Sequence, residues 1–234
     1  MSSERIWAVI PAAGIGARMK SDIPKQYLQI EDQTILEYSI NRFLEHSKVH
    51  KVVVALNSSD DYWKELPYQD NPRVVTTVGG DNRVDSVLAG LKKIQSFEGV
   101  EHDWVLVHDA ARPCLASQHI DDLIQSKESS PDGAILAVGA IDTVKRSNSR
   151  QVIDKTIDRE HVWLAQTPQF FPLRALRKAI EEATAAGNVV TDEASAMELA
   201  GYHPALVIGS RKNIKITEEE DLLLASIWLS HGIG

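Results

Sequence analysis

Near its start the chain reads IWAVIPAAGIGARM (residues 6–19), a short apolar run that leads directly into a glycine-rich turn. Such a run predicts a strand whose carboxyl end presents unpaired backbone N–H groups, which suit an anion such as phosphate. Arg18 and Lys25 follow glycines that let a polyanion approach the main chain closely. The segment therefore predicts a triphosphate site, and a glycine turn that only joins two elements is the alternative.

Two better-known glycine motifs do not fit this turn. The dinucleotide fingerprint requires a third small residue, where the chain has Met19, and an acidic residue at a strand end, whereas Glu37 lies in a stretch of helical spacing. The kinase-type phosphate loop ends in Gly-Lys-Ser/Thr, a tripeptide that the sequence lacks. The phosphate site is therefore of another kind.

Composition limits the classes of function that the chain can have. Its 234 residues are 43% hydrophobic, which is ample for a buried core, and we expect a single domain over residues 1–234. The formal net charge of -8 argues against a nucleic-acid surface. One cysteine, Cys114, excludes an internal disulfide, and no stretch resembles a signal peptide or a membrane span. We expect a cytoplasmic protein that binds neither nucleic acid nor membrane.

Strand-like and helix-like segments alternate along the chain. Strands are predicted at residues 6–10, 51–56, 73–78, 104–107, 134–138 and 205–208. Helices are predicted at 34–46, 83–94, 118–127, 173–186, 192–200 and 218–230. This order predicts an α/β fold with a mostly parallel twisted sheet, helices on both faces, and ligands beyond the carboxyl ends of the strands.

Residues 139–161 break this alternation. Two β-biased runs flank the polar turn at residues 147–150, which predicts a β-hairpin arm. A hairpin this polar is not stable alone in water, so we expect it to pack on something else. A solvated excursion from the sheet edge is the alternative.

Asp109 follows the predicted strand 104–107, at the same sheet edge as the glycine loop. A carboxylate beside a triphosphate would be repelled unless a divalent cation lay between them, and Mg²⁺ takes one or two carboxylates plus phosphate oxygens. Asp109 is therefore the predicted ligand of Mg²⁺ or another divalent cation. The alternative is a strand-end turn in which Arg112 pairs with Asp109.

A second glycine pair, at residues 79–80, precedes another predicted helix. These glycines could admit a base or a sugar, with Asp81 and Ser86 as specificity contacts and Arg83 near phosphate. Asp81 could equally cap the helix that follows.

Lys215 lies in a predicted strand just before an acidic helix start, so that it can project toward the ligand edge. Thr217 and Glu220 have the spacing of a capping box for that helix. By itself Lys215 would more often be a solvated surface lysine.

Taken together, these motifs resemble the 2-C-methyl-D-erythritol 4-phosphate cytidylyltransferases, a family of the nucleotidylyltransferase superfamily. The matching segments cover essentially the whole chain in family order: PAAG (11–14), PKQYL (24–28), GGD (79–81), VHDAARP (107–113), TPQFF (167–171), TDEAS (191–195) and NIK (213–215). The resemblance implies a Rossmann-like domain whose protruding arm interlocks two subunits, as a homodimer, which suits the hairpin at 139–161. It also implies transfer of CMP from CTP to a polyol phosphate, with release of pyrophosphate, in the non-mevalonate isoprenoid precursor pathway.

The resemblance assigns roles to individual residues. Those implied for the cytosine and ribose side are Ala12, Ala13, Gly80, Asp81 and Ser86, with Arg83 nearby. Those implied for the triphosphate are Gly14, Gly16, Arg18, Lys25 and Lys215, of which Arg18, Lys25 and Lys215 are catalytic. Those implied for the polyol phosphate are Asp109, Arg112, Thr143, Arg159 and Thr167, and the arm would carry Thr143 and Arg159 to the neighbouring subunit.

Two other functions remain open on the sequence alone. Ribitol 5-phosphate cytidylyltransferases are similar, but their first loop more usually has two glycines where this chain has Ala12-Ala13-Gly14, and they lack the Ala110-Ala111 pair. A nucleotide-binding module without catalysis is the other alternative, which the cations and Asp109 argue against. The chain ends soon after its last predicted helix, so we expect a monofunctional enzyme.

Overall fold

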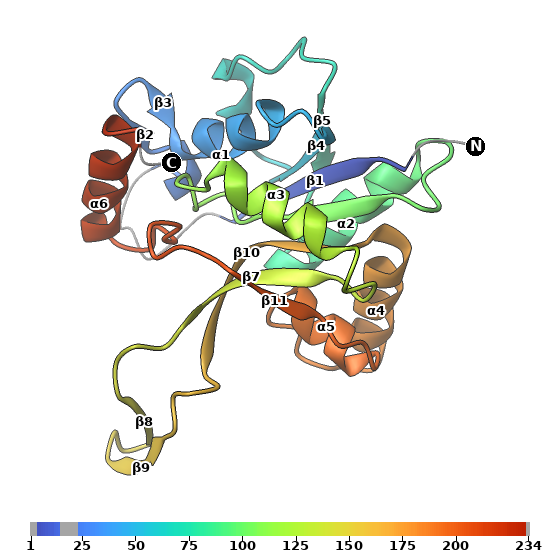
Figure 1. Ribbon diagram of the computed structural model, residues 1–234. Helices are drawn as coiled ribbons and strands as arrows, with labels where there is room; N and C mark the ends of the chain where they lie inside the picture. Colours follow the sequence, from blue (N-terminus) through green and yellow to red (C-terminus); the bar gives the residue numbers. More distant parts are fainter. Residues whose placement is uncertain (1–3, 15–22, 233–234) are drawn as a thin grey trace.

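The computed structural model describes residues 4–14 and 23–232, in which the central element is a seven-stranded sheet (Figure 1). Its strands are β1 (Ile6–Ala12), β4 (Val49–Leu56), β5 (Val74–Val78), β6 (Trp104–Val107), β7 (Ala134–Gly139), β10 (Trp163–Pro172) and β11 (Ala205–Ile208). They lie in the order β11-β7-β10-β6-β1-β4-β5, and all neighbours are parallel except where β10 pairs with β6 and β7. The predicted α/β fold with a mostly parallel sheet is confirmed.

Helices cover both faces of this sheet. They are α1 (Ile35–Leu44), α2 (Arg83–Gln95), α3 (Ser117–Ser126), α4 (Leu173–Ala185), α5 (Glu193–Leu199) and α6 (Glu219–Ser230), with short 3-10 turns at Lys25–Tyr27 and Trp63–Glu65. α1 and α3 pack on one face, and α2, α4 and α5 on the other (Figure 1). α6 lies at one end, against a small hairpin of β2 (Gln29–Ile30) and β3 (Gln33–Thr34).

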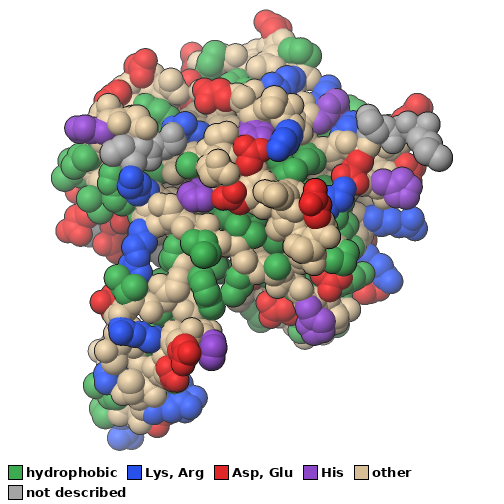
Figure 2. Space-filling model, in the orientation of Figure 1, with side chains coloured by type: hydrophobic (Ala, Val, Ile, Leu, Met, Phe, Trp, Pro, Cys, Tyr) green, Lys and Arg blue, Asp and Glu red, His purple; other side chains and the backbone are tan. Residues whose placement is uncertain are grey.

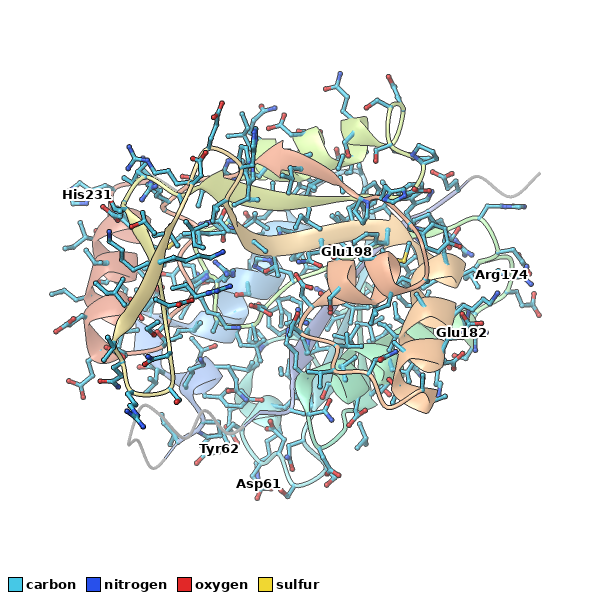
Figure 3. All side chains as sticks on the ribbon, turned by 90° about the horizontal axis from the view of Figure 1, so that it is seen from below. Asp61, Tyr62, Arg174, Glu182, Glu198 and His231 are labelled. Atoms are coloured by element: carbon cyan, nitrogen blue, oxygen red, sulfur yellow. The ribbon has the colours of Figure 1, made fainter. Side chains whose placement is uncertain are left out.

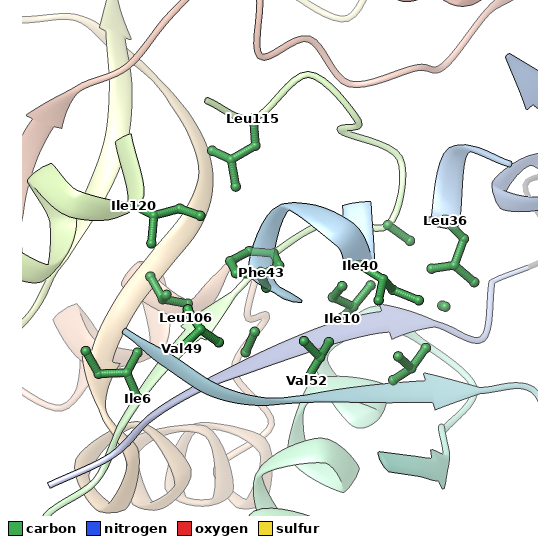
Figure 4. Close-up of a cluster of buried hydrophobic side chains, with 14 of the residues drawn as sticks. Ile6, Ile10, Leu36, Ile40, Phe43, Val49, Val52, Leu106, Leu115 and Ile120 are labelled. Atoms are coloured by element: carbon green, nitrogen blue, oxygen red, sulfur yellow. The ribbon is translucent and has the colours of Figure 1, made fainter. Parts of the chain in front are cut away.

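The apolar run that opens the sequence is the centre of the core. Ile10 of β1 belongs to the cluster that α1 and α3 complete, which Figure 4 shows around Ile40 and Phe43. Trp7 and Val9, on the opposite side of β1, belong to the cluster under α2, α4 and α5. β1 is therefore buried on both faces, which explains why its sequence is apolar without alternation.

Strand β10 is absent from the sequence-based prediction. It contains Pro168 and ends at Pro172, and proline removes a ladder hydrogen bond, so that a proline-containing stretch argues against a strand inside a sheet. The structure accommodates Pro168 because the register with β7 shifts between Ala165 and Gln169. β10 nevertheless lies in the middle of the sheet, and it is antiparallel because the arm returns the chain in the opposite direction.

The cap of α2 also differs from the expected one. Asn82, not Asp81, is the N-cap, and its side-chain oxygen accepts a hydrogen bond of 3.0 Å from the backbone N–H of Asp85. Asp81 is thus not required to begin the helix.

Helix α6 begins one residue later than the predicted capping box allows. Glu218 is the N-cap and pairs with Asp221, whereas the prediction named Thr217 and Glu220. Thr217 instead donates from its backbone N–H and its hydroxyl to Asp221, at 2.8 and 2.7 Å. Lys215 does not lie in a strand, so that part of the prediction is also wrong.

The hairpin predicted within residues 139–161 is present. Its strands β8 (Val144–Ser147) and β9 (Ile153–Ile157) are antiparallel and protrude from the body of the molecule (Figure 1). Lys and Arg side chains gather on this arm (Figure 2). Where the arm leaves the sheet, the backbone N–H of Ala140 donates to the carbonyl of Val162 at 2.9 Å. A role of the arm in dimerisation stays a prediction.

Gly90 tests the packing of α2 on β1. A Cβ at this position would lie 2.6 Å from Cγ1 of Val9. Glycine to alanine within a helix ordinarily stabilises by about 1 kcal/mol, but overpacking a core costs about 1–3 kcal/mol. We expect Gly90→Ala to lower the melting temperature, and to lower it less in a Val9→Ala background, where the methyl has room. A higher melting temperature for Gly90→Ala alone would contradict this packing.

Candidate active site

A pocket of about 270 Å³ opens at the carboxyl ends of β1, β5 and β6. This is the edge at which parallel α/β sheets bind ligands. The residues predicted for the site that line it are Ala12, Ala13, Gly14, Lys25, Gly80, Asp81, Arg83, Ser86, Asp109 and Lys215. The structure therefore brings together side chains from four segments that are far apart in the sequence.

The structure does not bring every predicted residue to this pocket. Thr143 and Arg159 lie on or beside the exposed arm, where the guanidinium of Arg159 donates to the carbonyl of Ile141. Gly16 and Arg18 lie outside the residues that the structure describes.

The glycine pair after β5 contributes main chain to the pocket wall. A Cβ at Gly80 would lie 2.3 Å from Cβ of Asp85, so a larger residue would not fit without moving α2. The backbone N–H of Gly80 donates to the hydroxyl of Ser86 at 3.2 Å, which ties this loop to the first turn of α2. Glycine at position 80 therefore lets this loop pack closely against the first turn of α2.

Asp109 is the electrostatic centre of the site. Its Oδ1 accepts from Nε of Arg83 at 2.8 Å, its Oδ2 lies 2.9 Å from Nζ of Lys215, and Nε of Arg112 lies 3.6 Å from Oδ2. Burial alone would raise the pKa of Asp109, but the surrounding cations outweigh burial and hold that pKa well below its usual range. Asp109 is therefore ionised at neutral pH, and the alternative in which Arg112 pairs with it is correct as geometry.

Glu193 is a site residue that the sequence-based prediction missed. It is buried at the start of α5 and accepts from Nη1 and Nη2 of Arg83 at 2.6 and 3.0 Å. Arg83 thus bridges Asp109 and Glu193 with three N–H groups. The segment around Glu193 predicted only helix capping, which is present between Asp192 and Ser195.

Side-chain hydrogen bonds hold the segment that carries Lys215. Asn213 is fully buried, and its Nδ2 donates to the carbonyl of Thr167 at 2.8 Å. Nζ of Lys25 donates to the carbonyl of Ile216 at 2.9 Å. Lys25 and Lys215 are therefore brought to the same side of the pocket although 190 positions separate them.

The family model of 2-C-methyl-D-erythritol 4-phosphate cytidylyltransferase (IspD) matches residues 6–231. The chain belongs to this family. A protein of that name from Vibrio vulnificus (strain CMCP6) is 51% identical over 223 residues, which are 95% of this chain and 94% of the relative. One from Shewanella halifaxensis is 47% identical over 230 residues, 98% of each.

Solved structures give the same result. The Francisella tularensis IspD structure aligns with a TM-score of 0.83 at 39% identity, covering 96% of this chain and 99% of that chain. A 4-diphosphocytidyl-2C-methyl-D-erythritol synthase aligns with a TM-score of 0.84 at 36% identity, covering 98% and 100%. This IspD family member is therefore a nucleotidyltransferase enzyme. Among its described residues, no helix is long and apolar enough to cross a membrane.

This IspD pocket has carboxylates that are candidate ligands of a divalent cation, whose other ligands would be phosphate oxygens. Within residues 4–14 and 23–232, no group of three or more His, Cys, Asp or Glu side chains could hold an ion without other ligands. Asp109 and Asp81 line the pocket, and Mg²⁺ typically takes one or two carboxylates together with phosphate oxygens. Asp109, as an ionised oxygen donor, remains the candidate ligand.

Breaking the pair between Arg83 and Glu193 should destabilise the fold. Removing one partner of a buried ion pair costs about 3–5 kcal/mol. In Glu193→Gln the loss should be smaller, because Gln keeps one acceptor and Asp109 still faces Arg83. We therefore expect Glu193→Gln to lower the free energy of unfolding by roughly 2–3 kcal/mol, measured by chemical denaturation. Glu182→Gln is the matched control. Glu182 lies on the outer surface of α4 (Figure 3), pairs with Lys178 at 3.6 Å, and should change stability by less than about 0.5 kcal/mol. Equal losses in the two variants would contradict a stabilising role for the buried pair.

Proposed function

We propose that this pocket transfers CMP from CTP to 2-C-methyl-D-erythritol 4-phosphate, giving 4-diphosphocytidyl-2-C-methyl-D-erythritol and pyrophosphate. One observation carries the proposal: in a member of this family, Lys25, Lys215 and Asp109 converge on one cavity with Gly14. The reaction supplies the non-mevalonate pathway to isoprenoid precursors. A cytoplasmic location is part of the same proposal, since CTP is a metabolite of that compartment.

The two ends of CTP would contact different parts of the pocket. Gly80, Asp81 and Ser86 line the pocket from the segment that joins β5 to α2, and we assign this segment to the base and the ribose. Lys25 and Lys215 line it from two other segments that meet where Nζ of Lys25 donates to the carbonyl of Ile216, and we assign them to the triphosphate. Residues assigned to the base are Ala12, Ala13, Gly80, Asp81 and Ser86, and those assigned to the triphosphate are Gly14, Gly16, Arg18, Lys25 and Lys215.

The transfer needs no general base in this proposal. A phosphomonoester has a second pKa of about 6, so its attacking oxygen is mostly ionised at neutral pH. Catalysis then consists of aligning two polyanions and stabilising the charge that develops at the α-phosphate. Lys25 and Lys215 supply fixed positive charge for this, and Lys215 can turn to the triphosphate because its side chain is 41% exposed. A divalent cation at Asp109 would add further charge neutralisation.

A homodimer completes the proposal. Thr143 and Arg159 are exposed and do not line the pocket of their own chain, so the arm would carry them to the sugar phosphate in a second copy. Val152 and Ile153 near the arm tip are 58% and 62% exposed, apolar surface that a second subunit would bury. Arg112 and Thr167 would contact the polyol phosphate from the same chain as Asp109.

Pyrophosphate release tests the function directly. We expect release from CTP with 2-C-methyl-D-erythritol 4-phosphate, and much slower release with ribitol 5-phosphate, because the Ala12-Ala13-Gly14 loop and the named relatives favour the erythritol substrate. Faster release with ribitol 5-phosphate would make the chain a ribitol enzyme. Binding of CTP with no release from either substrate would support a non-catalytic nucleotide-binding module.

Asp109 tests the metal part of the proposal. We expect a requirement for a divalent cation, and we expect Asp109→Asn to lower turnover by about 100-fold while CTP affinity changes far less, because charge builds up in the transition state. Asp61→Asn, which removes an exposed carboxylate paired only weakly with Lys64, is the charge-matched control. Equal turnover in Mg²⁺ and in excess chelator would refute the metal assignment.

Subunit mixing tests the arm. Arg159→Ala and Lys25→Ala should each be inactive, and mixing them under conditions that exchange subunits should restore partial activity, because one site in each mixed dimer has both residues intact. Each variant alone, treated identically, is the control. Failure to complement despite demonstrated exchange would assign Arg159 and Lys25 to the same subunit's site.

A further inference from the structure

We propose that His108 is a positioning residue for this reaction: it fixes the hydroxyl of Thr167, and that hydroxyl holds the main chain of Asp109 at the pocket wall. The inference rests on the proposed function. It concerns a side chain that does not line the pocket and to which the sequence alone gave no role.

The hydrogen bonds of His108 determine which ring nitrogen carries the proton. The side chain is fully buried, with Nε2 3.0 Å from the carbonyl oxygen of Arg112 and Nδ1 3.0 Å from Oγ1 of Thr167. A carbonyl oxygen can only accept, so Nε2 must be the donor. The ring is fully buried and both of its partners are uncharged, so the neutral ring is favoured and Nδ1 has no proton.

It follows that the single proton of the Thr167 hydroxyl is used within the protein. Since Nδ1 of His108 can only accept, the hydroxyl donates its proton to His108. The same oxygen accepts from the backbone N–H of Asp109 at 3.0 Å. No proton of this hydroxyl is left to donate to a substrate phosphate, so the contact of Thr167 that the structure shows is the one that holds the main chain of Asp109.

His108 also stabilises the turn that carries Asp109 and Arg112. The turn leaves β6 with the backbone N–H of His108 bonded to the carbonyl of Val9 at 2.9 Å, and it closes with the N–H of Arg112 bonded to the carbonyl of Asp109 at 3.1 Å. The ring of His108 adds a second closure, to the carbonyl of Arg112, and the ring of Phe43 packs edge-on against it at 5.3 Å. Asp109 is thus held from both sides by buried hydrogen bonds.

Kinetics of matched variants test the proposal. Thr167→Val removes only the hydroxyl at nearly constant shape, and His108→Phe removes both ring nitrogens. We expect each to lower kcat by about ten-fold or more, the usual effect of losing a group that orients a metal or phosphate ligand, with little change in the KM for 2-C-methyl-D-erythritol 4-phosphate. The double variant should be no slower than the slower single variant, because both changes break one chain of contacts. Thr167→Ser should recover most of the lost turnover.

Three kinetic results would overturn the proposal. They are a raised KM for the polyol phosphate with unchanged kcat in Thr167→Val, losses that multiply in the double variant, and normal kinetics in a folded His108→Phe protein. If the His108→Phe protein does not fold, the kcat and KM of Thr167→Val test the proposal without it. The ¹⁵N shifts of the His108 ring should show protonated Nε2 and unprotonated Nδ1, whatever the substrate is. Wild-type protein without turnover would refute the proposed function, whereas the opposite tautomer would refute this inference.

Discussion

The site depends on one constraint, which is that the buried carboxylate of Asp109 must be neutralised. Arg83 comes from α2, Lys215 from the segment before α6, and Arg112 from the turn after β6, and all three approach Asp109. A buried carboxylate without partners would be strongly unfavourable, so these contacts fix the relative positions of their segments. The geometry of the pocket follows from this requirement.

The same cluster reconciles an acidic protein with a polyanionic substrate. The chain has a formal net charge of -8, yet the pocket concentrates cations. Glu193 takes two of the N–H groups of Arg83, so that Arg83 is held by internal anions. Lys25 and Lys215 line the pocket, where fixed positive charge would act on phosphates in a partly desolvated setting.

Much of the fold was predictable from particular segments. The apolar run of residues 6–10 indicated strand β1, and the alternation of elements indicated a mostly parallel sheet. The hairpin within residues 139–161 was evident because its polar β-biased runs match no buried strand. Strand β10 was missed because a proline such as Pro168 argues against a strand inside a sheet. The structure accommodates Pro168 by a shift in the register between β10 and β7, and the sequence of β10 alone does not indicate this shift.

The sequence by itself determined most of the elements, the strand end at which the pocket begins, and the family to which the chain belongs, because hydrophobic periodicity and short motifs are local properties. The tertiary structure alone decided which charges meet. Glu193 lies 110 positions from Arg83, and Thr167 lies 59 positions from His108. No local pattern marks such partners, since burial and hydrogen-bond geometry exist only once the chain has folded. For the same reason, the neutral ring of His108 and the ionised carboxylate of Asp109 are results of packing, not of residue type.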